Sequence, residues 1–203
     1  VKEAHAGDIV AIAGLADISV GETVCDSSSR EALPILRIDE PTLKMTFMTN
    51  NSPFAGKEGK FITASKINER LFRETQKDVS LKVEQSGNES WVVSGRGELH
   101  LSILIETMRR EGFELQVSRP EVIMKEIDGV KCEPFEEVQI EVPEESMGNV
   151  IEALGLRNAV MENMSTVNNL TRLNYTIPSR GLIGFMTDFM TMTKGYGIIN
   201  HTF

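Results

Sequence analysis

An order of strands and helices that occurs twice is the feature of this sequence that most constrains its fold. In the first copy, apolar and polar residues alternate over Leu43–Met48, which is typical of a strand with one buried face. Ile67 and Leu71 then form an apolar helical stripe, with Ala64 and Phe72 beside them. The predicted elements of this copy are a strand at 43–48, a helix at 63–76, a hairpin of strands at 79–85 and 90–96, a helix at 98–110 and a strand at 113–117.

The same order returns after Pro120. The second copy is predicted to contain a strand ending at 135–142, a helix at 147–156, strands at 159–165 and 170–178, a helical segment after Arg180 and a final strand at 196–203. Both copies follow the βαββαβ order of the ferredoxin-like fold. The sequence therefore predicts an α+β protein in which two ferredoxin-like modules, 37–118 and 119–203, lie in tandem.

Residues 1–36 precede these modules and differ from them in pattern. The stretch "GDIVAIAGLADISVGETVCD" alternates short β-branched runs with Gly and Asp turns, as the end of a β-barrel does. It is too short to fold alone, and the chain has no initiator Met, so the sequence looks cut in mid-fold. The whole chain contains no apolar run of the ~20 residues that a membrane helix needs, and it contains no signal peptide. We therefore expect a cytoplasmic protein without a membrane partner.

The formal charge of −9 hides a strong local asymmetry. Residues 42–118 hold 11 basic and 10 acidic side chains (+1), 119–156 hold 3 and 10 (−7), and 157–203 hold 4 and 2 (+2). The basic residues at 66, 70, 73 and 77 fall on one face of the first predicted helix. That face is either a phosphate-contacting stripe or a solvated surface with ion pairs such as Glu69 with Arg73 and Arg70 with Glu74.

Other basic residues extend this hypothesis beyond the helix. The loop "SPFAGKEGK" either grips a phosphate oxygen or is a plain solvent loop. Cations of the second module are either RNA contacts or exposed surface charges. The candidate rRNA-binding residues are Lys57, Lys60, Lys66, Arg70, Arg73, Lys77, Arg172, Arg180 and Lys194. Methionines 161, 164, 186, 190 and 192 are expected to form an adaptable core rather than a binding groove.

The turn "SGRGELH" does not meet the requirements of a nucleotide site. It lacks the Lys-Ser/Thr pair of a phosphate loop, and His100 stands where a dinucleotide fingerprint needs its third glycine. Glu98 in the first helical turn would repel a phosphate, so Gly95 and Gly97 are expected to supply backbone freedom and a close helix-sheet approach. The sequence has no catalytic triad, and Cys25 and Cys132 lack metal spacing. We expect no enzyme activity, cofactor or metal in this chain.

Several stretches together resemble translational GTPases of the elongation factor G class. These are "AGDIVAIAGLADISVGETVCD", similar to the end of their second, β-barrel domain, "GRGELHLSILIETMRREGFEL", similar to their third domain, and "PFEEVQIEVPEESMGNVIEALGLRNA", similar to the start of their fifth. Within the class, "NNSPFAGKEGKFIT" and "SRGLIGFMTDFMTMTKGYGIINHTF" most resemble the BipA/TypA family of stress-adaptive, ribosome-associated GTPases. In the elongation factor itself a further domain separates the two ferredoxin-like modules, whereas Arg119 and Pro120 join them directly here.

The resemblance implies a piece of a larger protein that binds GTP and Mg²⁺ elsewhere, in a G domain whose motifs this sequence does not contain. It implies that this piece docks the parent between the two ribosomal subunits, contacts rRNA, ribosomal proteins and its own G domain, and is monomeric. A LepA-type factor has the same direct juncture and remains an alternative. Three other classes also remain. They are a base-reading RNA module, for which the strands offer only Trp91 and Phe113, a metabolite-sensing pair of ferredoxin-like domains and, last, an isolated enzyme.

Overall fold

The first sheet belongs to a βαββαβ unit. The structure is a computed structural model, and it describes residues 3–15, 18, 20–34 and 40–203. The elements of this first unit are β1 (Leu43–Thr49), α1 (Ala64–Lys77), β2 (Lys82–Gly87), β3 (Ser90–Gly95), α2 (Glu98–Arg110) and β4 (Leu115–Val117). The strands lie in the order β2-β3-β1-β4, and each pairs antiparallel with its neighbour. β5 (Glu121–Val122) also pairs with β1, so the first sheet extends past the predicted boundary at residue 118.

One face of this sheet and both helices enclose the first core. On β1, Leu43, Met45 and Phe47 are buried while the residues between them are more exposed, as the alternation predicts. Ile67 and Leu71 of α1 are fully buried against them. The prediction that Phe72 joins this stripe is wrong, because its side chain turns to solvent and is 64% exposed.

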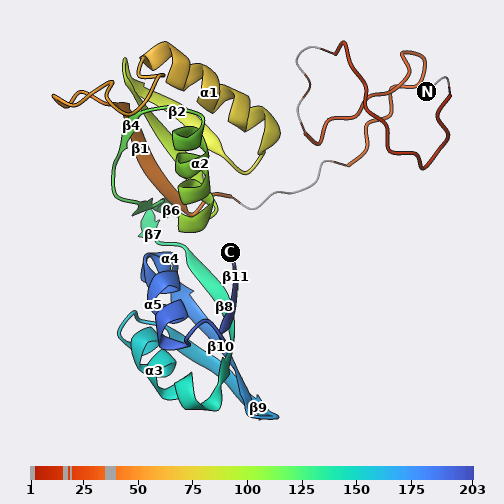
Figure 1. Cartoon of the computed structure of the whole chain (residues 1–203). Coiled ribbons are helices and arrows are strands. Elements are labelled where there is room, and N and C mark those ends of the chain that lie inside the picture. The colour runs from red at the N-terminus through yellow and green to blue at the C-terminus, as the bar shows by residue number, and fades with distance from the viewer. Residues whose placement is uncertain (1–2, 16–17, 19, 35–39) are drawn as a thin grey trace.

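The second sheet repeats this topology with its own core. Its elements are β8 (Phe135–Pro143), α3 (Glu144–Gly155), β9 (Val160–Val167), β10 (Leu170–Pro178), α4 (Ser179–Leu182), α5 (Phe185–Met192) and β11 (Ile198–Thr202). The strand order β11-β8-β10-β9 is that of the first sheet with each strand replaced by its counterpart. Figure 1 shows α3 and α5 on the same side of this sheet. The prediction of an α+β protein with two ferredoxin-like units is confirmed.

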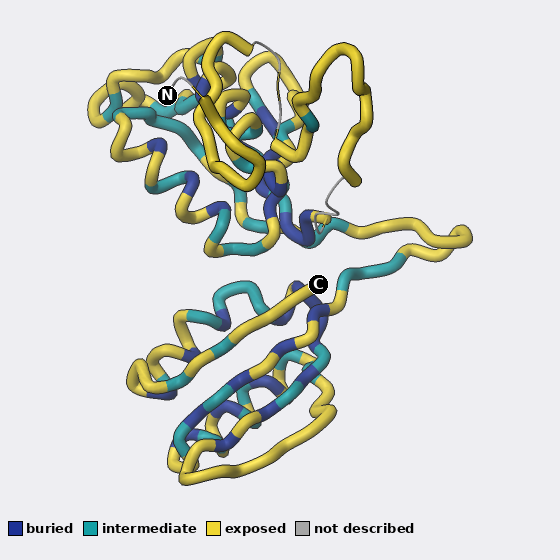
Figure 2. Tube along the Cα trace, turned by 90° about the vertical axis from the view of Figure 1, so that its right-hand side faces the viewer, coloured by how far each residue is buried: buried dark blue, intermediate teal, exposed yellow. Residues whose placement is uncertain are grey.

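A short hairpin of β6 (Lys125–Ile127) and β7 (Val130–Cys132), absent from our sequence prediction, lies between the two units in the chain. Asp128 and Gly129 form its tip, with φ of 53° and 78°. Two consecutive residues with positive φ are the requirement of the tightest hairpin turn, and Asp-Gly is a preferred pair for it. Figure 2 shows this hairpin as an exposed arm, whereas buried backbone gathers separately in each unit.

The segment before the first sheet differs from its prediction. The described residues 3–15, 18 and 20–34 contain no strand, and side chains such as Ile9 are exposed there. A strand needs a neighbour for its N–H and C=O groups, and the apolar runs of this segment have none among the described residues. The assignment of 1–36 to a β-barrel domain therefore stays a prediction. Most of the predicted connector 37–41 lies outside the described residues.

The methionine prediction is correct only in part. Met192 packs against the second core, but Met161, Met164 and Met190 are between 40% and 49% exposed. The first two lie on the edge strand β9, whose eight residues are all exposed. Among the described residues, no helix combines the length and the apolar character needed to cross a membrane.

Candidate functional site

The loop between β1 and α1 is held in place by one carboxylate, that of Glu114. Its two oxygens accept the backbone N–H groups of Gly56 (3.0 Å), Glu58 (3.1 Å) and Gly59 (2.9 Å), and the side-chain amide of Asn50 also donates to it. These hydrogen bonds, that of Gly56 first, lower the pKa of Glu114 to about 2. The loop is therefore neither a free solvent loop nor an open anion site.

Gly56 and Gly59, two residues of the loop that could have gripped a phosphate, thus already donate their backbone N–H groups to Glu114. Gly59 is required for this arrangement, because a Cβ at that position would lie 2.5 Å from the Cβ of Glu114. The anchored loop leaves its cations on the outside. Lys57 lies over the ring of Phe54 at 4.8 Å from its centroid, and the side chain of Lys60 is exposed.

Three cations of α1 are exposed on one side of the helix. Lys66, Arg73 and Lys77 recur at helical spacing, and all three side chains are exposed. Lys66 and Arg73 contact the same carboxylate, that of Glu69, at 3.0 Å and 3.1 Å. Two cations that share one anion keep a net positive charge. We call Lys66, Arg73 and Lys77 the α1 basic face.

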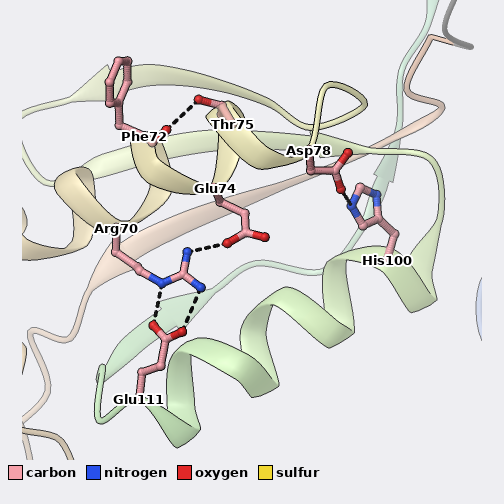
Figure 3. A network of polar contacts seen from close by, with 7 residues as sticks. All are labelled: Arg70, Phe72, Glu74, Thr75, Asp78, His100 and Glu111. Atoms are coloured by element: carbon pink, nitrogen blue, oxygen red, sulfur yellow. Dashed lines mark hydrogen bonds and ion pairs between the residues drawn. The ribbon is translucent and has the colours of Figure 1, made fainter. Parts of the chain in front are cut away.

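Arg70, predicted as a fourth member of this face, has a different role (Figure 3). Its side chain is only 7% exposed, and its Nη2 atom donates to Glu111 at 3.0 Å while Nη1 bonds to Glu74. The hydrogen bonds from Arg70 to Glu111 raise the pKa of this guanidinium further. Arg70 thus joins α1 to the end of α2, and it is less accessible to RNA than the three residues of the α1 basic face. Its role as an RNA contact stays a prediction.

The predicted cations of the second unit are each paired with a glutamate. Lys194 lies 3.5 Å from Glu145. The other two pairs are Arg172 Nε with Glu141 Oε1 at 2.9 Å and Arg180 Nε with Glu133 Oε2 at 2.7 Å. One-to-one pairing leaves little excess positive charge at these positions. These three residues stay predictions, but the surface around them favours RNA less than the α1 basic face does.

The Gly-Arg-Gly turn leads directly into a contact between the two units, which Glu98 makes at the start of α2. A Cβ on Gly95 would lie 2.9 Å from Leu101 Cδ2, so this glycine permits the close helix-sheet approach that we predicted. Gly97 is extended (φ −180°), so it does not need the conformational freedom of glycine. The carboxylate of Glu98 accepts the backbone N–H of Gly184 at 2.7 Å, and Ile183 packs against the first core.

A cavity of about 520 Å³ lies beside this contact between the units. Its apolar walls include Leu99 and Ile103 of α2 and Met186 of α5. Glu136, almost fully buried, bonds to His201 and thereby raises the pKa of the imidazole. The imidazole of His201 thus supplies a hydrogen-bond partner for a carboxylate that is buried away from water.

Within the described ranges, no three His, Cys, Asp or Glu side chains lie close enough together to hold a metal ion. Cys25 and Cys132 are free thiols. The site that the geometry favours is therefore the surface of α1 and its preceding loop. Sequence reasoning missed two parts of it, the Glu114 anchor and the contact between Phe61 and Phe113, whose ring centroids lie 5.0 Å apart. The position of Phe61 between Lys60 and Lys66 was the available signal.

Comparison with known proteins adds independent information. The family model described as "Elongation factor G C-terminus" matches residues 130–203. The whole chain is similar to "Large ribosomal subunit assembly factor BipA" of Bacillus subtilis (strain 168), at 62% identity over 100% of this chain and 34% of the relative. Proteins of the same description from two other organisms are also similar. The one from Synechocystis sp. is 54% identical over 100% of this chain and 34% of the relative, and the one from Escherichia coli (strain K12) is 55% identical over 98% of this chain and 33% of the relative.

The chain spans about a third of the length of these relatives. Among solved structures, it is similar to the crystal structure of the protein ttk003000868 from Thermus thermophilus, with a TM-score of 0.52 and 14% sequence identity. That alignment covers 84% of this chain and 41% of the other. At this identity the likeness concerns the fold alone.

Proposed function

Because the chain corresponds along its whole length to about a third of a BipA-type protein, we propose that it docks its parent protein onto ribosomal RNA. The relatives are named as assembly factors of the large ribosomal subunit. In our proposal the chain itself is not catalytic. GTP and Mg²⁺ bind to other parts of the parent, and the two ferredoxin-like units hold its contacts to both ribosomal subunits.

The observation that supports this proposal most directly is the α1 basic face. Its cations stand on a helix whose apolar side is buried in the first core, so their positions are fixed relative to the sheet. Lys57 and Lys60 extend the positive charge along the anchored loop. Cations that neutralise phosphates release condensed counterions, which gives sequence-independent affinity that falls steeply with salt.

We propose that rigidity couples this surface to the state of the parent's G domain. Glu98 and Ile183 join the two units, so a force on one is transmitted to the other instead of bending a loose linker. A role in stress-adaptive translation belongs to the same proposal.

A metabolite-sensing function is a second candidate that the cavity supports. Its volume of about 520 Å³ and its position between two units are typical of small-molecule sites. A shift of the unfolding temperature on addition of a metabolite, abolished by filling the cavity with Ile103→Trp, would support this candidate over docking.

The docking proposal is tested by reversing the shared charges of the α1 basic face. We expect Lys66→Glu with Arg73→Glu in the full-length protein to weaken association with large-subunit particles by roughly tenfold or more at low salt. The slope of log affinity against log salt should fall by about 1–2 because two phosphate contacts are lost. Both quantities are measured by co-sedimentation over a salt series.

The matched control is a similar pair on the other helix. Arg109 and Arg110 of α2 also share one carboxylate, that of Glu106, and their side chains are 69% and 75% exposed. Changing both arginines to Glu alters the net charge by the same amount as the double variant of the α1 basic face does. Equal loss in the two double variants would show that only net charge matters, and unchanged binding of the α1 variant would remove this face from the proposal.

A further inference from the structure

We propose that a hollow beside the α1 basic face binds an unpaired RNA base by stacking. This inference rests on the proposed docking function and deepens it, because it names single-stranded RNA as the preferred ligand. The hollow has a volume of about 320 Å³ and lies between α1 and the turn that leads into β4. Its lining consists of two aromatic residues, Phe61 and Phe113, the group of Lys66, Glu69 and Arg73, and the ion pair of Arg70 and Glu111.

The aromatic wall of the hollow is fixed in place. The backbone N–H of Phe61 donates to Gly112 (3.0 Å), and its carbonyl accepts from the N–H of Glu114 (3.2 Å). Its ring contacts that of Phe113 at 5.0 Å, yet Phe61 remains 38% exposed. A residue whose backbone is fixed by hydrogen bonds, and whose ring packs on a second ring while still reaching solvent, is a preorganised platform, since little conformational entropy is lost when a base stacks on it.

The polar groups around this ring fit a nucleotide. Lys66 and Arg73 share Glu69 and keep positive charge for the phosphate that follows the base. Glu111 is 40% exposed in its side chain, so its carboxylate has acceptor capacity left for the N–H groups of a base edge after it binds Arg70. Arg70 keeps that carboxylate in position.

The arrangement favours a single strand over a duplex. A base inside a duplex is stacked on its neighbours and cannot enter a side hollow, whereas an unpaired base can turn outward. Aromatic rings alternating with cations are the usual composition of single-strand sites. Duplex RNA is expected to use only the cations, through its phosphates.

The test compares two RNAs on the full chain. One is a single-stranded oligonucleotide with a central 2-aminopurine, and the other is a blunt duplex of the same length; binding is measured by fluorescence and anisotropy. We expect the wild type to quench 2-aminopurine. Phe61→Ala should raise Kd for the single strand about tenfold and leave Kd for the duplex unchanged. Phe61→Leu, which keeps apolar packing against Phe113, should lose the quenching, and Phe61→Tyr should retain it.

Phe72→Ala provides the matched control. Phe72 is more exposed than Phe61, at 64%, and belongs to α1, but it lies outside the hollow. The stacking inference is wrong if Phe72→Ala weakens single-strand binding as much as Phe61→Ala does. It is also wrong if the Phe61 variants leave Kd for both RNAs unchanged, or raise Kd for both by the same factor. In each of these cases the docking proposal stands. If the wild type binds neither RNA, the docking proposal itself fails.

Discussion

Single carboxylates determine the conformation of the first unit's functional surface. Glu114 replaces an external anion for three loop amides, and Glu111 holds the guanidinium of Arg70. The sequence pattern around Arg70 suggested a surface cation, since its spacing fits that of Lys66 and Arg73. Its main partner lies 41 residues away, and helical periodicity does not reveal such a pairing. Residue spacing predicted which cations of α1 lie on one face, but it did not predict that Arg70 is buried and pairs with Glu111.

The depressed pKa of Glu114 makes the loop sensitive to acid. The pKa is about 2 in the folded protein against an ordinary value of 4.5, so the ionised carboxylate stabilises the fold fully above about pH 5. This contribution is lost progressively as pH falls from there towards 2. We expect Glu114→Gln to lower the unfolding temperature at pH 7 and the difference from wild type to shrink below pH 4.

Hydrogen exchange of the Gly56, Glu58 and Gly59 amides provides a second measurement. These amides should exchange faster in Glu114→Gln at pH 7, because an amide side chain has only one acceptor oxygen. Glu84→Gln, at an exposed carboxylate on β2, is the control and should leave them unchanged. A constant difference in unfolding temperature from pH 7 to pH 3 would contradict this role of the charge.

At the scale of elements, strands and helices with strong local signals were predicted closely. The helix at 98–110 and the strand at 170–178 have the predicted bounds, because their apolar spacing is regular and their ends are marked by glycine or proline. The hairpin of β6 and β7 was missed although Asp128-Gly129 is a turn signal. Its strands have only three residues each, too few to show a period.

The turn between β9 and β10 gives a test at this scale. Asn168 and Asn169 have φ of 52° and 64°, a region that asparagine tolerates and β-branched residues do not. Asn169→Val should lower the free energy of unfolding by about 1–2 kcal/mol. Asn169→Gly should maintain or raise it, because glycine adopts this conformation without steric cost. Denaturant unfolding measures both variants, and equal stability of the two would exclude backbone strain as the cause.

For the whole molecule, the decisive contacts are those between the two units. They are made by Glu98 at the start of α2 and by Ile183 and Gly184 between α4 and α5, two segments that the sequence does not mark as neighbours. Ile183→Ala combined with Glu98→Gln removes an apolar contact and weakens a hydrogen bond across the junction. We expect a loss of about 1–2 kcal/mol, less than for a fully buried isoleucine because Ile183 is only partly buried.

The informative readout is the shape of the unfolding transition. Calorimetry should show one transition for the wild type and two for the double variant, since each unit has its own core. Leu156→Ala, at a side chain that is 82% exposed, serves as the control. A single transition in the double variant would show that other contacts suffice to couple the units.

The strand order also affects how this chain is made. Every strand of the first sheet has been translated once Val122 is added, so that sheet can close while the 81 residues from Ile123 to Phe203 are still being synthesised. At 5–20 residues per second this interval lasts roughly 4–16 s. The second sheet, by contrast, receives its edge strand β11 only at Thr202. The nascent polypeptide can thus present the surface proposed to face RNA before its other half has emerged.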